Sequence, residues 1–192
     1  MARRKDHTRE ELIKLAVDCG LKIVAAQGIQ ALTARKVAEK MGYTPGTLYN
    51  LFENIDALAA AINCVTLKNF AEKIADIRAR STTAPKKLLE RICYAYIQLQ
   101  QDSPNLWTLL FATPLSNKSD SYTQATHSVF DQVVDTISPL CPSRKTARRD
   151  AKIIWATLHG ICLLEQSRKL NVTEPDSPET LIKRFLNQFL TR

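Results

Sequence analysis

Apolar residues recur along the chain every three or four positions, the spacing that places side chains on one face of an α-helix. No stretch of strand length alternates apolar and polar residues between turn residues. The pattern therefore predicts an all-α protein with about nine helices. The expected helices, separated by Gly and Pro, cover about 7–27, 34–41, 45–51, 55–80, 85–102, 104–112, 119–138, 143–170 and 177–191.

Gly20 lies inside the first of these expected helices. A glycine in a helix interior costs about 1 kcal/mol relative to alanine. Because a glycine also lets another backbone or side chain come close, we expect tight helix packing at this position.

The stretch TPGTLYNLF, residues 44–52, opens with proline and glycine, the two poorest residues for a helix interior. Thr33 is a good N-cap for a short helix that Gly42 ends. Thr44 then caps a second short helix, in which Pro45 takes the first position, where its missing N–H costs nothing. Two short helices joined by a tight turn are typical of a helix-turn-helix, whose second helix enters the major groove of DNA.

The same residues carry a resemblance to a known family. The run GIQALTARKVAEKMGYTPGTLYNLFENIDAL, Gly28 to Leu58, resembles the TetR-type transcriptional regulators, including their Gly-Thr-Leu-Tyr-x-x-Phe pattern. WATLHG, Trp155 to Gly160, is similar to a Trp-x-x-x-His-Gly signature of one class of the family's C-terminal domains. The resemblance implies a three-helix DNA-binding domain at 1–54 and a helical effector-binding and dimerisation domain at 55–192.

The resemblance also implies roles for single residues. Thr33 and Tyr49 match positions that bond phosphates, Thr47 matches one that contacts phosphate or base, and Arg35 matches one that reaches a guanine. With no Cβ, Gly46 lets the helix start approach the sugar-phosphate chain closely. The residues expected at the DNA are Thr33, Arg35, Thr44, Pro45, Gly46, Thr47, Tyr49 and Asn50, with Arg3, Arg4 and Lys5 as an arm along the backbone or in the minor groove.

Each of these roles has a structural alternative. Tyr49 could be packed between helices, and Arg35 could be a solvated surface charge. The basic tail could serve only as a solubilising terminus. One position also departs from the family, which often places a phosphate-binding lysine just after the second short helix. This chain has Ile55 there, so one phosphate contact is in doubt.

The helices expected at 143–170 and 177–191 carry apolar residues on two faces. Helices of this kind must bury both faces, one in the protein's own core and the other against a partner. The resemblance implies a homodimer, and the two-faced helices are compatible with a two-fold four-helix interface, although a monomer with both helices fully internal stays open.

In the family, the C-terminal domain binds a small-molecule effector. Aromatic residues gather in this half of the chain and could line a ligand site, although each could equally belong to the core. The candidate ligand-binding residues are Trp107, Phe111, Tyr122, Phe130, Trp155 and His159. The three histidines have no metal-ligand spacing, so we expect no metal, and we expect no cofactor.

Charge and composition narrow the class of protein. The net charge of +8 favours an anionic partner such as nucleic acid or an anionic surface, or reflects a solvated exterior. The five basic residues between 144 and 152 are expected to form a solvated face, with an acidic partner or an anionic effector as the alternative. Five scattered cysteines give no disulfide framework. No apolar run has the length of a membrane span and no signal peptide is visible, so we expect a cytoplasmic protein without a membrane partner.

These observations favour a homodimeric DNA-binding regulator, a repressor that a small-molecule effector releases from a palindromic double-stranded operator. Two alternatives stay open: a basic helical adaptor that binds protein or anionic surfaces, and a small helical enzyme. The sequence has no nucleophile–base motif, no Gly-rich phosphate loop and no paired carboxylates at useful spacing, so we expect no enzyme. The operator sequence, the effector, the regulated genes and the sign of regulation are not indicated by the sequence.

Overall fold

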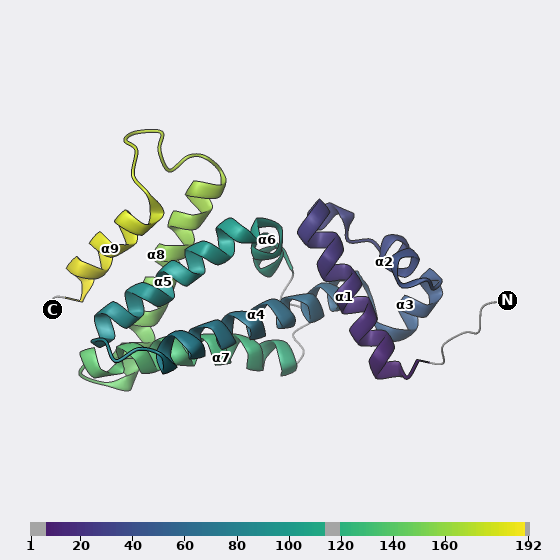
Figure 1. Ribbon diagram of the computed structural model, residues 1–192, viewed down its shortest axis with the longest axis horizontal. Coiled ribbons are helices and arrows are strands. Elements are labelled where there is room, and N and C mark those ends of the chain that lie inside the picture. The colour runs from purple at the N-terminus through teal and green to yellow at the C-terminus, as the bar shows by residue number, and fades with distance from the viewer. Residues whose placement is uncertain (1–6, 114–119, 191–192) are drawn as a thin grey trace. The chain divides into compact units, whose positions relative to one another are not determined.

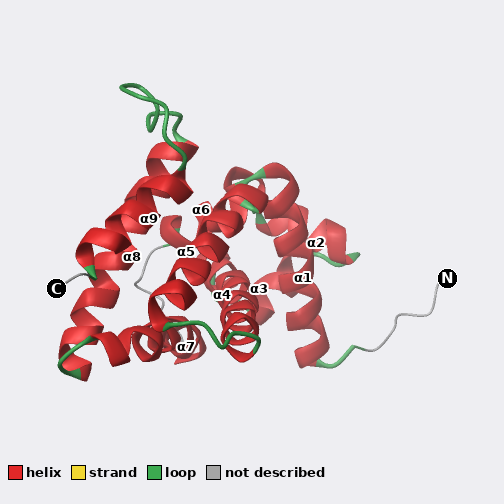
Figure 2. Ribbon diagram, turned by 60° about the vertical axis from the view of Figure 1, so that its left-hand side comes forward, coloured by secondary structure: helices red, strands yellow, loops and turns green. Residues whose placement is uncertain are grey.

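The computed structural model describes residues 7–113 and 120–190. Within these ranges the chain forms nine α-helices, two 3₁₀ turns and no strand, which confirms the all-α prediction (Figure 1, Figure 2). The helices are α1 (Arg9–Gln27), α2 (Ala34–Met41), α3 (Pro45–Leu51), α4 (Ile55–Ala79), α5 (Pro85–Asp102), α6 (Pro104–Ala112), α7 (Asp120–Ile137), α8 (Arg144–Gln166) and α9 (Pro178–Phe189), and the 3₁₀ turns are η1 (Ile29–Ala31) and η3 (Ser138–Leu140). None of the helices described combines the length and the apolar character that crossing a membrane requires.

The helices belong to two structural units. Unit 1 takes the chain through Thr66 together with Asn105–Thr123, and unit 2 takes Leu67–Pro104 together with the residues from Gln124 onward. Helix α4 is continuous, with residues in both units. The predicted division into a DNA-binding domain at 1–54 and an effector-binding and dimerisation domain at 55–192 stays a prediction.

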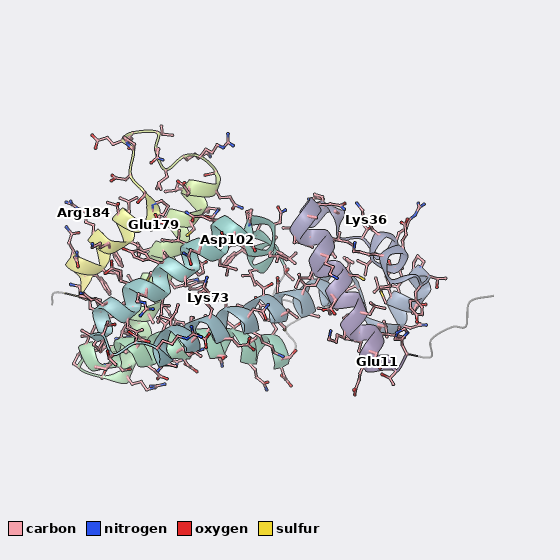
Figure 3. All side chains as sticks on the ribbon, in the orientation of Figure 1. Glu11, Lys36, Lys73, Asp102, Glu179 and Arg184 are labelled. Atoms are coloured by element: carbon pink, nitrogen blue, oxygen red, sulfur yellow. The ribbon has the colours of Figure 1, made fainter. Side chains whose placement is uncertain are left out.

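Helix α1 in unit 1 begins with a reciprocal cap. The Thr8 hydroxyl accepts a hydrogen bond from the Glu11 N–H at 3.2 Å, and the Glu11 carboxylate accepts one from the Thr8 N–H at 2.8 Å. Glu11 marks this end of α1 in Figure 3. The pair forms a capping box, which satisfies two backbone donors that a helix start leaves open. The helix therefore begins at Arg9, slightly later than its apolar pattern predicts.

One core holds unit 1 together. It buries side chains from α1, α2, α3, the first half of α4, and α6, among them Ala16, Val24, Val37, Leu48, Leu58, Ile62 and Leu109. Two asparagines fix α6 to this core. Asn105 donates to the Ala25 carbonyl of α1 at 3.0 Å, and Asn63 of α4 donates to the Leu109 carbonyl at 3.1 Å. Helix α6 is therefore part of the unit that carries α2 and α3.

Two parallel ion pairs join α7 to α8 within unit 2. Arg148 bonds Asp131 at 2.6 Å, and Arg144 bonds Asp135 at 2.8 Å. Because both the acids and the arginines are four residues apart, each pair lies one helical turn from the other. The Arg148 guanidinium also lies 5.3 Å from the ring centroid of Phe130. Two members of the basic run at 144–152 thus join helices instead of facing an external anion.

Helix α8 ends at Gln166, before the limit near residue 170 that its pattern predicts. Arg168 adopts a left-handed φ of 56°, and the Lys169 N–H bonds the Leu164 carbonyl at 2.8 Å. This is the hydrogen bond of a Schellman ending, a motif that usually places glycine at the left-handed position. Since the chain has arginine there, no glycine marked this helix end in the sequence.

Candidate nucleic-acid interface

Helix α2 is defined by a hydrogen-bonded cap at each end, and the second cap leads into the turn before α3. Thr33 caps α2, because its hydroxyl oxygen accepts a hydrogen bond from the Lys36 N–H at 3.3 Å. Gly42 ends α2 with a left-handed φ of 76°, and the Tyr43 N–H bonds the Ala38 carbonyl at 2.9 Å. The left-handed ending at Gly42 turns the chain sharply, so that only three residues separate the end of α2 from the start of α3. The predicted helix-turn-helix is therefore present.

The amino end of α3 is open to solvent. Pro45 holds the first helical position after Thr44, as its pattern predicts, but the Thr44 side chain makes no capping hydrogen bond to the backbone. Its hydroxyl lies instead 3.3 Å from that of Thr47. A β-carbon built on Gly46 would meet nothing closer than the Thr44 hydroxyl at 3.8 Å. Position 46 is therefore not crowded by any other described residue of unit 1.

The two faces of α3 differ sharply in exposure. Leu48 is 3% exposed and packs into the core of unit 1, whereas Tyr49 next to it is 58% exposed. Thr47 is half-buried. The remaining candidate residues of this helix and its cap are exposed: Thr44, Pro45, Gly46 and Asn50. Helix α3 is thus held by one apolar face and presents its polar face outward, and the alternative in which Tyr49 is enclosed between helices does not hold.

Thr33 and Arg35 lie at the start of α2, both exposed. The Thr33 oxygen is used as the helix cap, and its O–H can still donate to a phosphate. Arg35 forms no ion pair with an acid anywhere in the residues described, so its guanidinium is available to an external acceptor. Residues Arg3, Arg4 and Lys5, the expected arm, lie outside the described residues.

The position that departs from the family has a structural role. Ile55 begins α4 and packs against the core of unit 1, and the preceding Asn54 caps the helix by accepting a hydrogen bond from the Ala57 N–H at 2.9 Å. A lysine here would offer a cation to a phosphate, whereas Ile55 offers only apolar contact. Glu53, just before this cap, is exposed.

One contact beside the turn was not anticipated from the sequence. The Nδ1 atom of His7 lies 2.9 Å from the Tyr43 hydroxyl, and the two rings meet edge to face with centroids 6.2 Å apart. This bond ties the start of α1 to the turn between α2 and α3. Its two residues are 36 positions apart, and no local pattern connects them.

The six candidate ligand residues are divided between the two units. Trp107, Phe111 and Tyr122 belong to unit 1, and the other three belong to unit 2. In unit 1, the Trp107 ring is buried and lies 5.0 Å from the ring of Phe111, which is exposed. Tyr122 is half-buried on α7.

In unit 2, Phe130 lies under the guanidinium of Arg148. Trp155 is 49% exposed, and its ring centroid lies 6.4 Å from that of His159. His159 is half-buried, and its Nδ1 atom lies 3.1 Å from the hydroxyl of buried Tyr96. Burial lowers the pKa of His159 below its usual 6.5, which favours the neutral imidazole at pH 7.

Helix α8 carries an apolar face that unit 2 does not cover. Its buried residues point into the unit, whereas Ile153, Leu163 and Leu164 are large and exposed on the opposite side. Gly160 lies among them, and a β-carbon there would meet nothing within 4 Å. On α9, Ile182 and Leu186 are buried, and Phe185 and Phe189 are half-buried and stacked 5.1 Å apart. The predicted two-faced character of α8 is therefore present.

The cysteines among the described residues are all free. Burial raises the pKa of Cys93 and of Cys162 to about 12, so both thiols stay protonated and inert at neutral pH. No group of three or more His, Cys, Asp or Glu side chains suited to a metal ion occurs in the described part of the chain.

Comparison with known proteins agrees with this geometry. Residues 17–62 match the bacterial regulatory proteins of the tetR family, and residues 89–189 match the tetracyclin repressor-like C-terminal domain. An uncharacterized HTH-type regulator of Bacillus subtilis, YobS, is 25% identical over 92% of this chain and 92% of its own length. An uncharacterized HTH-type regulator of Mycobacterium tuberculosis is 22% identical over 92% of this chain and 78% of its own. A TetR regulator from Rhodococcus sp. RHA1 has a similar fold, with a TM-score of 0.71, 13% identity, and coverage of 95% of this chain and 98% of the other.

These family matches and relatives identify the chain as a helix-turn-helix, DNA-binding transcriptional regulator, a class of protein with a non-enzymatic function. The chain belongs to the TetR family, because the matching C-terminal domain spans more than half of its residues and the matching N-terminal domain covers the helix-turn-helix. The similarity to the Trp-x-x-x-His-Gly class stays a prediction.

Proposed function

We propose that this regulator is a repressor that places α3 in the major groove of its operator. The observation that carries the proposal is the contrast between buried Leu48 and exposed Tyr49 on one short helix. A helix anchored in this way holds its polar residues rigidly at the surface, as groove reading requires. Arg35 would read a guanine through its O6 and N7 atoms, and Thr33, Thr47 and Tyr49 would position the protein on the backbone.

The operator would be read by two copies of the chain. The exposed apolar residues of α8, together with the half-buried phenylalanines of α9, support a two-fold four-helix interface. A dimer of this kind reads two half-sites about 34–36 Å apart, one turn of DNA, arranged as a near-palindrome. Such a protein acts where the chromosome lies, in the bacterial cytoplasm.

A small-molecule effector bound in unit 2 would release the operator. The continuity of α4, which contributes residues to both units, supports a mechanical link between the two sites. By thermodynamic linkage, operator DNA must weaken effector binding by the same factor by which the effector weakens DNA binding.

Selection of bound sequences from a random duplex pool tests this proposal. A consensus with two-fold symmetry is expected, and the protein should bind it as two chains per duplex. Binding should weaken steeply with salt, because phosphate contacts release counterions. Retention of random duplexes without any consensus would contradict groove reading and favour a basic adaptor that adheres to anionic surfaces.

A further inference from the structure

Unit 2 encloses a polar side chain whose oxygen has no partner. Gln100 of α5 is 5% exposed, and its Oε1 atom is buried without a hydrogen bond to any described residue. Burying an amide oxygen in this way costs free energy, because water satisfied the oxygen in the unfolded chain. Most buried polar groups in native proteins are paired, so an orphaned acceptor marks a place where a ligand or a water molecule can complete the hydrogen bonding.

The neighbours of Gln100 define where its side chain lies. Tyr96 and Gln100 are four residues apart on α5, so they share one face of that helix, and Pro104 begins α6 just beyond its end. Tyr96 bonds His159 of α8 at 3.1 Å, and the Pro104 carbonyl accepts a hydrogen bond from Gln166 of α8 at 3.4 Å. Gln100 lies between these two contacts in sequence, on the face of α5 that meets α8.

Side chains of decreasing exposure lie between the surface of unit 2 and Gln100. Trp155 is half exposed, and its ring lies near that of half-buried His159. The His159 Nδ1 atom bonds the hydroxyl of Tyr96, which is buried, and Gln100, one turn further along α5, is buried too. Tyr96 also meets the ring of Phe70 edge to face, with centroids 5.9 Å apart. The surroundings therefore combine aromatic faces with the amide, hydroxyl and imidazole groups.

The interior of unit 2 holds no charge that would neutralise an ionic ligand. Among the described residues of this unit, the buried polar side chains apart from Tyr96 are Gln100 and Thr136, and no Lys, Arg, Asp or Glu is buried. Thr136 bonds the Gln132 carbonyl of its own helix. His159 is neutral at pH 7 because burial lowers its pKa. A carboxylate or ammonium group taken into this interior would be left unpaired, at high cost.

We propose that Gln100 and the Tyr96–His159 pair form the polar end of the effector site, and that the effector is an uncharged, mostly apolar molecule whose hydroxyl or other donor bonds the Gln100 oxygen. This inference rests on the effector-binding role proposed above and adds to it the recognising residue and the ligand class. A charged analogue of the same size binds less well, because its charge has no counter-charge inside unit 2.

The test uses two pairs of probes that differ only in charge: 1-octanol against octanoate, and 2-naphthol against 2-naphthoate, at pH 7. Binding to the full-length protein is followed by calorimetry and by the shift of thermal unfolding. At least one neutral probe is expected to bind saturably and at least tenfold more tightly than its carboxylate counterpart. Equal or tighter binding of the carboxylates overturns the inference, as does the absence of saturable binding by both neutral probes.

The variant Gln100→Leu separates recognition from a structural role. It removes the orphaned oxygen and keeps the volume, so the ligand-free protein should be as stable as the wild type or more stable. The same variant should lose at least tenfold in affinity for the neutral probe, whereas Gln101→Leu, an exposed neighbour on α5, should leave it unchanged. An unaltered affinity in Gln100→Leu would mean that water alone satisfies the oxygen, and would overturn the inference.

Operator binding is measured in parallel with the same protein samples. If the wild type and Gln100→Leu both bind the selected duplex and neither binds a neutral probe, the ligand inference fails and the regulator function stands. If neither protein binds a selected duplex, the function proposed above fails, whatever the probes do.

Discussion

Gly20 of α1 packs so closely against Ile62 of α4 that a β-carbon on the glycine would lie 2.7 Å from the Ile62 Cδ1 atom. Ile62 is fully buried in the core of unit 1, so its Cδ1 atom can move only within packed surroundings. Any side chain at position 20 therefore has to displace Ile62. The glycine brings α1 and α4 together at the centre of the unit that carries the DNA-reading helices.

A double-mutant cycle at this contact measures the crowding. Gly20→Ala gains about 1 kcal/mol of helix propensity but overpacks the core, which typically costs about 1–3 kcal/mol. Ile62→Val removes the crowded Cδ1 atom, so Gly20→Ala should be more favourable by about 1 kcal/mol in the Ile62→Val background than in the wild type. Urea unfolding of the four proteins gives the coupling, and purely additive effects would show that Ile62 turns aside without cost.

The helix pattern was largely readable from the sequence because Gly and Pro mark most helix ends in this chain. Gly20 in a helix interior predicts close packing from the sequence alone. Only the structure identifies Ile62 as the partner, because no local pattern connects two residues 42 positions apart. The predicted end of α8 near residue 170 is wrong for a related reason. Arg168 adopts the left-handed conformation that usually belongs to glycine, so the sequence has no glycine to indicate the end of the helix.

The candidate site was predictable to a different degree in its two parts. Helix α3 follows from a short local motif, Pro45 to Leu51, so the exposure of Tyr49 could be anticipated. The environment of Gln100 depends on how α5 meets α8, a long-range packing that periodicity does not specify. The bond between His7 and Tyr43 escaped prediction for the same reason.

Loss of the Arg35 and Tyr49 groups should weaken operator binding. Arg35→Ala removes the expected guanine contact and should cost about 1–3 kcal/mol, with relaxed preference at one base pair. Tyr49→Phe removes one hydroxyl and should cost about 0.5–1.5 kcal/mol equally for all sequences. Fluorescence anisotropy with the selected duplex and single-base variants of it measures both effects. Arg91→Ala, an exposed arginine of α5, serves as the control and should bind like the wild type.

Restoring the lysine that the family often has after α3 should strengthen contact with phosphate. In Ile55→Lys, the aliphatic stem can keep part of the packing of Ile55 while the ammonium reaches solvent. Affinity should rise for selected and random duplexes alike, and the slope of log K against log salt should become steeper by about 0.9. Ile55→Met keeps the size without the charge and should leave the slope unchanged. An equal slope in all three proteins would mean that position 55 does not face the backbone.

A charge on the uncovered face of α8 should separate the proposed dimer. Leu163 is 51% exposed in the single chain, and Leu163→Glu would bury an unpaired carboxylate at a two-fold interface. Sedimentation at micromolar concentration should show a dimer for the wild type and mostly monomer for the variant, which should also lose affinity for the two-fold operator. Val172→Glu changes an exposed apolar residue in the loop between α8 and α9 and should remain a dimer. A Leu163→Glu protein that stays dimeric would exclude this face of α8 as the interface.

The burial of His159 should make stability depend on pH. Burial holds the pKa of His159 in the folded protein below the 6.5 that it has in the unfolded chain. Below pH 6.5 the unfolded chain therefore binds a proton that the folded chain does not, and acidification favours unfolding. Thermal unfolding between about pH 7.5 and about pH 5.5 should show a falling Tm in the wild type and a shallower fall in His159→Gln. His127→Gln, at an exposed position of α7, should keep the wild-type slope, and an equal slope in all three proteins would show that His159 does not contribute to the pH dependence.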